Sequence, residues 1–370
     1  MVKNPTSLSV YYHSRLVGTL LMNPEGRIGF SYADGWLKDG FSISPFSLPL
    51  KPGIFLPKKD GPGLLFAVFN DSLPDSWGSF VINRWLVKKG INPAELNPLA
   101  RLALLDERAS GALRYQKKEN ALLDDRVSFD EAREECLSLI EKRDCAGLDR
   151  LAELGGSSGG THPKIHFRQN GVDYLVKFPG PQDPLTFGKD EYLYNQAAEK
   201  CGIHVAASAL FKSERCPGYF ASLRFDRANG ERIHMISLAA LYEVSFGEGL
   251  LDYGHLFSAA WKLTKDKATL EEVYRRMIFN VLAKNDDDHA KNFAFLYDEK
   301  KGTYLLAPAY DLTPSGSLLM HGMSVHHNPY PTAEDCHALA ASFGFSAHAM
   351  EKIDGEVSPV VFSELKAYLD

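Results

Sequence analysis

The chain has 370 residues, of which 45% are hydrophobic and 24% are charged, and it contains 30 glycines and 20 prolines. These proportions are those of a folded globular protein with two or three domains. They exclude a small disulfide scaffold, a collagen-like or coiled-coil protein and a wholly disordered chain. The 41 Lys and Arg residues against 47 Asp and Glu residues give a net charge of −6, so the chain as a whole does not attract DNA or an anionic membrane surface.

The sequence also favours a cytoplasmic protein. The five cysteines are odd in number and no two of them have a C-x-x-C spacing, which indicates reduced thiols. The first residues, Met1-Val-Lys-Asn-Pro-Thr-Ser7, lead into polar alternation, not into the apolar core of a signal peptide. No run of 18 apolar residues occurs, so we expect no membrane span.

The N-terminal part of the chain predicts a small antiparallel sheet with helices covering one side. Apolar and polar residues alternate between positions 8 and 32, and Asn23-Pro-Glu-Gly26 between two of the runs is typical of a turn. From 64 to 106 apolar residues recur at three- and four-residue spacing, most clearly from Trp77 to Val87. Asp75 or Ser76 is the expected N-cap of that helix.

A polar stretch at 115–128 interrupts this patterning and predicts a domain seam near 115–150. Ser128-Phe-Asp-Glu131 has the capping-box pattern, so a helix should begin there and run to about Glu141. The glycine-rich segment from Leu154 to Phe167 predicts a flexible tip that leads into a strand.

The rest of the chain first mixes strands and helices and then becomes mainly helical. After about residue 240 helical spacing dominates, and it is broken most clearly at 293–310, where two apolar runs flank a polar turn. The expected elements are a strand at Asp173-Tyr-Leu-Val-Lys-Phe-Pro179, a helix at 188–201 ended by Gly202, strands within 203–226 and a hairpin at 293–306.

The densest chemical signal is the segment Asn285-Asp-Asp-Asp-His-Ala-Lys-Asn292, and Asp311 follows the expected hairpin. Kinases place a proton-accepting Asp and a metal-binding Asn as D-x-x-x-x-N before a second metal-binding Asp. Asp287 and Asn292 have that spacing. The competing interpretation is a solvated acidic turn. A calcium loop is disfavoured, because its acids alternate and its sixth position is glycine, whereas the acids here are consecutive.

Three upstream features stand in the chain order that a kinase requires. Gly155 to Gly160 form a turn whose backbone N–H groups could approach phosphates, because glycine lacks the Cβ that would block them. Lys177 is a charge inside an apolar strand, which favours a phosphate or carboxylate partner, but an edge-strand lysine reaching water fits equally well. Glu191 could pair with Lys177, or it is simply an acid near a helix N-terminus.

Several motifs resemble those of the HipA family of bacterial serine/threonine kinases, the toxin half of HipA–HipB toxin–antitoxin systems. The resemblance spans most of the chain, and the D-x-H-A-K-N element with a later Tyr-Asp is its most specific part. The motifs are Ser42-Ile-Ser-Pro-Phe-Ser-Leu-Pro-Leu50, Phe69-Asn-Asp-Ser-Leu-Pro-Asp-Ser76, Gly156-Ser-Ser-Gly-Gly-Thr-His-Pro-Lys164, Leu223-Arg-Phe-Asp-Arg227 and Asp287-Asp-His-Ala-Lys-Asn292.

The resemblance implies a role for each motif residue. Asp287 would be the catalytic base, Asn292 and Asp311 would bind Mg²⁺, and Lys177 would hold the ATP phosphates, in agreement with the chemistry above. The other ATP contacts would be Gly159, Gly160, Thr161, His162, Pro163 and Lys164, the hinge residues Leu223, Arg224 and Phe225, and His289, Ala290, Lys291 and Tyr310.

The resemblance also implies a switch. Family members autophosphorylate a serine of the glycine loop, and Ser157 stands at that place, with Ser158 as its neighbour. The added negative charge would repel the ATP phosphates and shut the enzyme off. Without the resemblance, Ser157 would be a small polar residue suited to a flexible loop.

The resemblance implies an α+β fold of the two-lobed protein-kinase-like (HipA-like) type, with an N-terminal β-rich subdomain and a mainly α-helical C-lobe. ATP and Mg²⁺ would be the cofactors, a helix-turn-helix HipB-like antitoxin the partner, and a translation component such as an aminoacyl-tRNA synthetase the substrate. DNA would be contacted only through the antitoxin. The expected segments are 1–115 for the β-rich subdomain, 116–153 for a helical connector, 154–240 for the nucleotide-binding lobe and 241–370 for the catalytic C-lobe.

Departures from the family pattern leave alternatives open. Leu223 stands where an acidic hinge residue is familiar, and Thr161-His162-Pro163 replaces a more usual Ala-Gln-Glu, which leaves nucleotide affinity and loop switching open. The chain after Asp311 is short, so less surface remains for a partner or DNA. A small-molecule kinase would use the same catalytic residues. A non-catalytic nucleotide-binding repressor subunit is the second alternative, although mere binding does not require a catalytic base.

Overall fold

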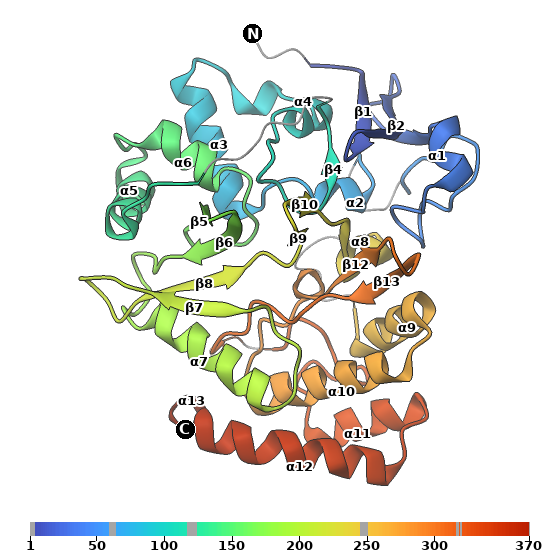
Figure 1. Cartoon of the computed structure of the whole chain (residues 1–370), viewed down its shortest axis with the longest axis vertical. Helices are drawn as coiled ribbons and strands as arrows, with labels where there is room; N and C mark the ends of the chain where they lie inside the picture. Colours follow the sequence, from blue (N-terminus) through green and yellow to red (C-terminus); the bar gives the residue numbers. More distant parts are fainter. Residues whose placement is uncertain are drawn as a thin grey trace. The chain divides into compact units, whose positions relative to one another are not determined.

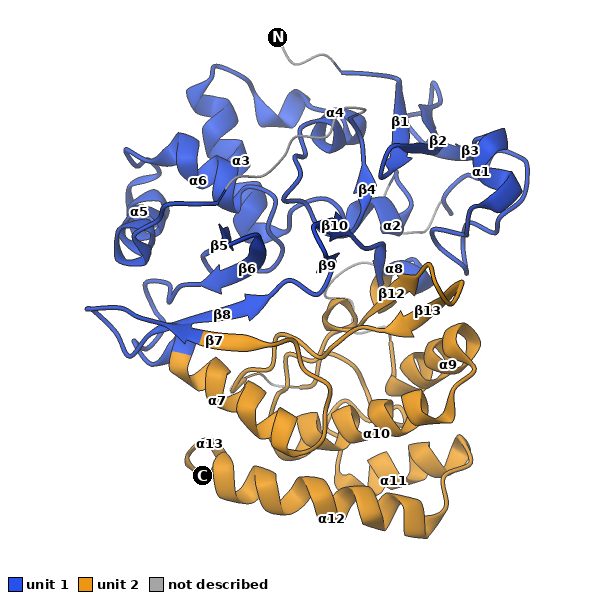
Figure 2. Ribbon diagram, in the orientation of Figure 1, with its two compact units in different colours: residues 1–188, 210–236, 240–244 blue, residues 189–209, 237–239, 245–370 orange. Residues whose placement is uncertain are grey.

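The computed structural model describes residues 4–58, 64–116, 124–244, 251–315, 318 and 320–369, and its elements are shown in Figure 1. The chain forms two compact units (Figure 2). Unit 1 comprises Met1–Gly188, Leu210–Ile236 and Ala240–Val244, and unit 2 comprises Lys189–Ala209, Ser237–Ala239 and Ser245–Asp370. The expected segments 1–115 and 154–240 therefore fall largely in the same unit.

The predicted N-terminal antiparallel sheet is confirmed in unit 1. Its strand order is β3-β2-β1-β4, and the first three strands follow one another along the chain. The turn at Asn23-Pro-Glu-Gly26 is closed by the Arg27 N–H, which donates to Asn23 Oδ1 at 2.8 Å. The strands are β1 (Ser7–Tyr12), β2 (Arg15–Met22), β3 (Ile28–Tyr32) and β4 (Leu113–Arg114).

The two predicted helices of unit 1, one after Asp75 and one after Ser128, are confirmed. α3 spans Ser76–Lys88 behind the N-cap Asp75. α5 spans Phe129–Lys142 and begins at Ser128, whose hydroxyl accepts the Glu131 N–H at 3.4 Å. Residues 117–123 of the predicted seam lie outside the described residues. The other helices are α1 (Asp34–Asp39), α2 (Ala67–Asn70), η1 (Pro93–Glu95), α4 (Pro98–Ala103) and α6 (Leu148–Gly155).

A second four-stranded sheet, which belongs to unit 1 except for Ser208 and Ala209 of β7, has the order β5-β6-β8-β7. α6 contacts α3, α5 and β5, and its apolar residues are buried in the same core as Phe167 and Tyr219 of the sheet. Periodic apolar residues thus bring helix and sheet together. The remaining strands of this part of the chain are β5 (Lys164–Gln169), β6 (Val172–Lys177), β7 (Ser208–Phe211), β8 (Tyr219–Leu223), β9 (Arg227–Ala228), β10 (Glu231–Arg232) and β11 (Met235–Ser237).

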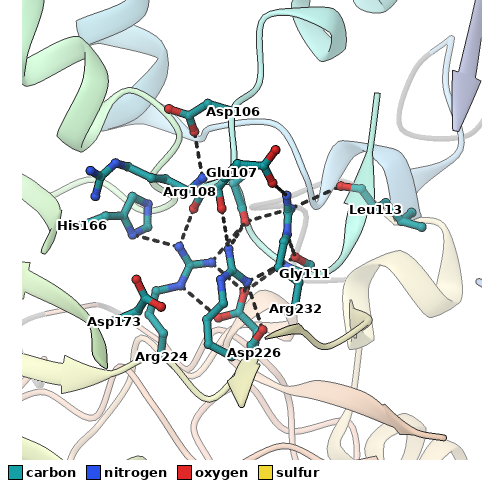
Figure 3. Close-up of polar contacts among 12 residues, drawn as sticks. Asp106, Glu107, Arg108, Gly111, Leu113, His166, Asp173, Arg224, Asp226 and Arg232 are labelled. Atoms are coloured by element: carbon teal, nitrogen blue, oxygen red, sulfur yellow. Dashed lines mark hydrogen bonds and ion pairs between the residues drawn. The ribbon is translucent and has the colours of Figure 1, made fainter. Parts of the chain in front are cut away.

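Buried arginines after β8 hold the loop that precedes β4 (Figure 3). Arg224 and Arg227 contact the Asp226 carboxylate at 2.6 and 2.8 Å, and Asp226 also accepts the Gly111 N–H at 2.8 Å. Arg232 donates to the Gly111 carbonyl at 2.8 Å. Burial by itself would raise the pKa of Asp226, but the charges of Arg224 and Arg227 hold it well below its usual value. Because buried charges are tolerated only when paired, this cluster ties the N-terminal sheet to the second sheet within unit 1.

Unit 2 is mainly helical, as predicted for the chain after residue 240. The central helix α10 (Lys267–Leu282) contacts α9, α11 and α12. The predicted helix at 188–201 and hairpin at 293–306 are confirmed as α7 and as the antiparallel pair β12 and β13. The elements are α7 (Phe187–Lys200), α9 (Tyr253–Thr264), β12 (Ala294–Asp298), β13 (Thr303–Leu306), α11 (Ala333–Ser342), α12 (Ala347–Glu364) and α13 (Lys366–Leu369). The residues of the short helix α8 (Leu238–Tyr242) are divided between the two units.

Two further properties concern membrane-spanning helices and the cysteines. Within the described ranges, no helix combines the length and the apolar character that crossing a membrane requires. All five cysteines are free thiols, and four of them are buried.

Candidate active site

The segment Asn285–Asn292, which we call the catalytic loop, directly follows α10 in unit 2. The chain turns sharply at Lys284, which has a φ of 53°. Asn285 then bonds back to Asn280 of the helix, by its N–H to the carbonyl at 3.0 Å and by its amide to Oδ1 at 3.0 Å. The loop ends in the short helix η2 (Ala290–Asn292) and leads into β12. Both of its ends are therefore fixed on regular elements.

Asp287 has a fixed backbone and an accessible carboxylate. Its N–H donates to Ser315 Oγ at 3.0 Å, and its carbonyl accepts the Asn292 side-chain amide at 2.8 Å. Half of its side chain, 51%, is exposed, and His289 Nε2 lies 3.8 Å from Oδ1. A substrate hydroxyl can therefore reach this carboxylate while the loop around it stays in place.

Asn292 and Asp311 line the same small cavity of unit 2, although β12 and β13 separate them in the sequence. The cavity offers about 10 Å³, which is room for about one water-sized sphere. Asn292 uses its amide NH₂ for the bond to Asp287, so a cation in this cavity could be bound only by its carbonyl oxygen. Asp311 has a φ of 59°, a strained conformation for a residue other than glycine and one that is typical of functional sites. The Tyr310 hydroxyl donates to the Lys291 carbonyl at 2.5 Å and ties this segment to the catalytic loop.

Asp288 is the residue of this loop that sequence reasoning missed. Its fully buried carboxylate accepts the Tyr253 hydroxyl at 2.6 Å and the Gly322 N–H at 2.9 Å, and it contacts His321 Nδ1 at 3.0 Å. The other nitrogen of His321 lies 3.1 Å from Asp286. Three consecutive acids look alike in a sequence, and only their distant partners show that Asp288 anchors the loop while Asp287 stays accessible.

We expect His321 to make the stability of this site depend on pH. Burial disfavours the imidazolium, but the hydrogen bond to Asp288 and the charges of Asp288 and Asp286 outweigh burial and raise the pKa of His321 above 6.5. A raised folded-state pKa adds stability that is fully present below about pH 6.5 and is lost as the pH rises through the folded value. The gap in unfolding free energy between wild type and His321→Gln should therefore shrink from pH 6 to pH 9.

Urea denaturation at several pH values measures this gap. His348→Gln is the matched control, because His348 is exposed on α12, and it should show no such trend. A gap that stays constant or widens with pH would mean that His321 is not held as an imidazolium.

Two buried lysines of unit 1 lie directly opposite each other on neighbouring strands. Lys164 of β5 and Lys177 of β6 are register partners, so their side chains leave the same face of the sheet. They are only 4% and 6% exposed. Like charges placed opposite each other repel, and an anion such as a phosphate relieves that repulsion. The pair therefore fits the predicted phosphate contacts.

The glycine loop precedes this pair and is partly buried. Gly155, Gly156, Ser157 and Ser158 are buried, so this half of the loop is not an exposed tip, and its flexibility stays a prediction. The reason for the burial is close packing on α3, which no local sequence signal shows. Gly160, with a φ of 77°, lies over Lys164, since a Cβ at Gly160 would be 2.4 Å from the ammonium.

The other predicted nucleotide contacts of unit 1 differ in burial and in the partners of their side chains. His162 lies against the Phe187 ring, with centroids 4.6 Å apart, and 3.5 Å from Asp183. Pro163 is buried, and Thr161 is exposed. In the segment Leu223–Phe225, the Arg224 guanidinium is already bonded within the buried arginine cluster, so a nucleotide could use only its backbone.

The structure brings together the predicted residues of each unit. In unit 2 it places Asp287, Asn292 and Asp311 around one loop and one cavity. In unit 1 it places Lys164, Lys177 and the glycine loop together. Glu191 is fully buried near the start of α7 in unit 2, and its pairing with Lys177 remains a prediction.

The donor groups fit both cofactors that the sequence predicts. Mg²⁺ prefers oxygen ligands and is usually held by one or two protein groups together with phosphates and waters. The carboxylate of Asp311 and the amide oxygen of Asn292, beside a cavity of cation size, are such a set. The lysine pair and the glycine backbone of unit 1 suit the phosphates of ATP.

The fold is that of a two-lobed, protein-kinase-like α+β protein. The solved structure of a Shewanella oneidensis complex, described as HipA, HipB and their operator DNA, matches 98% of this chain and 90% of its own chain, with a TM-score of 0.70 and 17% identity. The family model of the HipA-like C-terminal domain matches residues 156–362, and that of the HipA N-terminal domain matches residues 8–116. The chain belongs to the HipA family.

Curated relatives agree with this assignment. The "Putative kinase Y4dM" of Sinorhizobium fredii is 24% identical over 331 residues, which cover 83% of this chain and 76% of the relative. The "Serine/threonine-protein kinase toxin HipA" of Shewanella oneidensis is 26% identical over 309 residues, which cover 71% of this chain and 65% of the relative. Both of these relatives are thus named as kinases.

Proposed function

We propose that this protein is an ATP- and Mg²⁺-dependent serine/threonine-protein kinase and the toxin of a toxin–antitoxin pair. The observation that carries the proposal is the catalytic loop. It combines an accessible carboxylate at Asp287 with a cation-sized cavity lined by Asn292 and Asp311. A binding module needs no accessible acid beside a metal site, whereas phosphoryl transfer needs both.

In the proposed reaction a Ser or Thr hydroxyl of the substrate attacks the γ-phosphorus of ATP. Asp287 accepts the hydroxyl proton while the new O–P bond forms, and the bond to the oxygen shared with the β-phosphate breaks to release ADP. Mg²⁺, when bound, neutralises phosphate charge. Asn292 and Asp311 would hold it by their oxygens. Lys164 and Lys177 would orient the phosphates.

The remaining predicted residues complete the proposed nucleotide site. Glu191 would pair with Lys177 and fix the lysine for its phosphate. The backbone N–H groups of the glycine loop would approach the phosphates closely. The other contacts would be Thr161, His162 and Pro163, the backbone of Leu223, Arg224 and Phe225, and His289, Ala290, Lys291 and Tyr310.

The biological setting is proposed from the family. The substrate would be a translation component, with an aminoacyl-tRNA synthetase as the substrate class. The partner would be a HipB-like helix-turn-helix antitoxin, and DNA would be reached only through it. The related Shewanella structure, which contains HipA, HipB and operator DNA, supports this partner. Cytoplasmic location would follow from that role.

We further propose that Ser157, or less readily Ser158, accepts a phosphate and silences the enzyme. Ser157 is only 6% exposed, and its hydroxyl has no hydrogen-bond partner among the described residues. Ser158 is fully buried and donates to the Gly155 carbonyl at 2.6 Å. The loop must therefore open before either hydroxyl can attack ATP, and the added charge would keep it from closing again.

The test is intact-mass spectrometry of the purified chain with Mg²⁺ and ATP. We expect wild type to gain one phosphate that peptide mapping places at Ser157 or Ser158, and we expect Asp287→Asn to gain none. Ser157→Ala separates the two serines. Phosphate transfer to a protein argues against a small-molecule kinase. If wild type neither gains phosphate nor binds ATP, the kinase proposal fails.

A further inference from the structure

The N-terminus of α3 contacts the glycine loop at several points within unit 1. Asp75 is the N-cap of α3, yet its carboxylate makes no capping hydrogen bond to that helix. Instead, its Oδ2 accepts the Gly160 N–H at 3.3 Å. An Asp at this position ordinarily caps its own helix, so its use for the loop is a departure that needs a reason.

Trp77 makes two more bonds, one to the same loop and one to the first residue of β5 behind it. Its backbone N–H, one of the helix's first amides, donates to the Gly160 carbonyl at 3.0 Å. Its indole N–H donates to the Lys164 carbonyl at 2.9 Å. Gly160 is therefore held by both its N–H and its carbonyl. Because Gly160 lies over the Lys164 ammonium, these bonds also set the place where the loop meets the lysine pair.

The rest of the glycine loop packs tightly against α3. A Cβ at Gly78 of α3 would be 2.4 Å from the Ser158 carbonyl oxygen, and a Cβ at Gly156 would be 2.5 Å from Ile82 of α3. Helix and loop thus touch backbone to backbone. Ser157, which stands between Gly156 and Ser158 in the chain, is buried, and its hydroxyl has no hydrogen-bond partner within the described part of the chain, which costs free energy. The closed loop exists because the contacts with α3 outweigh that cost.

We propose that Asp75 and Trp77 are positioning residues that hold the glycine loop closed over Lys164 and thereby hide Ser157. This inference rests on the proposed function for the statement that the closed loop receives ATP phosphates. The closure itself does not depend on it. Loss of either contact would let the loop open, which weakens nucleotide binding and exposes position 157.

A thiol reporter tests the closure without any phosphoryl transfer. Ser157→Cys in a Cys216→Ser background places a small thiol in the buried site, and the other four cysteines are buried. We expect Asp75→Ala to speed maleimide labelling of this reporter by about tenfold, the factor expected from the loss of one hydrogen bond to a charged acceptor. Asp75→Asn keeps an acceptor oxygen and should restore slow labelling. Trp77→Phe should act in the same direction as Asp75→Ala.

Asn97→Ala is the matched control, because Asn97 is the N-cap of α4 in the same unit and accepts the Ala100 N–H. It should leave the labelling rate unchanged. Equal labelling of the parent and Asp75→Ala would overturn the proposal, as would an increase with Asn97→Ala of the same size.

The role of the closed loop in nucleotide binding is measured separately. Asp75→Ala should raise KM for ATP with little change in kcat, and Mg-ATP should slow labelling of the parent. Faster labelling without protection by ATP would keep the closure but overturn its role in nucleotide binding.

Discussion

Asp287→Asn should reduce phosphoryl transfer by about 10²- to 10⁴-fold, the usual contribution of a general base. Asparagine has the same shape, but it cannot accept the hydroxyl proton. The main-chain bonds from Asp287 to Ser315 and from Asn292 do not involve the carboxylate, so the loop should keep its structure. Because the side chain is half exposed, stability should change little. Single-turnover transfer of labelled phosphate to Ser157, or to a substrate once one is found, measures the effect.

Asp298→Asn is the control for this experiment. Asp298 lies in the same unit, at the turn between β12 and β13, where its carboxylate accepts two backbone N–H groups. Asparagine can accept the same bonds, so the transfer rate should stay near that of wild type. If Asp287→Asn keeps more than about a tenth of the wild-type rate, a factor far below that of a general base, another group accepts the proton.

Asp288→Ala should have the largest effect on stability. Its buried carboxylate is bonded to Tyr253, His321 and Gly322, and its removal takes away the acceptor for the Tyr253 hydroxyl, the Gly322 N–H and His321 Nδ1. Breaking a buried, hydrogen-bonded charge pair by removal of one member typically costs about 3–5 kcal/mol. We expect a loss of that order in urea denaturation at pH 7. We also expect reduced phosphoryl transfer, because the backbone of Asp287 is displaced with the loop.

A double-mutant cycle shows whether this anchor acts as described. Tyr253→Phe removes only the hydroxyl that donates to Asp288, and it should cost about 1–3 kcal/mol on its own. In the Asp288→Ala background the same change should cost nearly nothing, because the partner is already gone. Additive costs would show that the hydroxyl stabilises the protein through Asn280, its other neighbour, and not through Asp288.

Local sequence patterns predicted most elements of the fold. The cap Ser128 and the residue Gly202 after α7 marked helix ends correctly, because their hydrogen bonds are made within a few residues. Asp75 also marked the start of α3, although its carboxylate makes no capping hydrogen bond to that helix. The hairpin after the catalytic loop was equally clear from its polar turn. By contrast, β4 has two residues and pairs with β1 from the far end of the N-terminal segment, so no local pattern marks it.

The sequence by itself determined the kinase-like set of Asp287, Asn292 and Asp311, because their spacing and order are properties of the chain. Tertiary structure alone decided which of the neighbouring acids is exposed and which is buried. Asp287 and Asp288 are neighbours with the same side chain, yet one is half exposed and the other fully buried, because only Asp288 meets Tyr253 and His321. The burial of Ser157, whose neighbours Gly156 and Ser158 pack against α3, was likewise decided by contacts between segments far apart in the chain. Spacing along the sequence predicts interactions between residues that are close in the chain, whereas burial depends on which distant residues pack together.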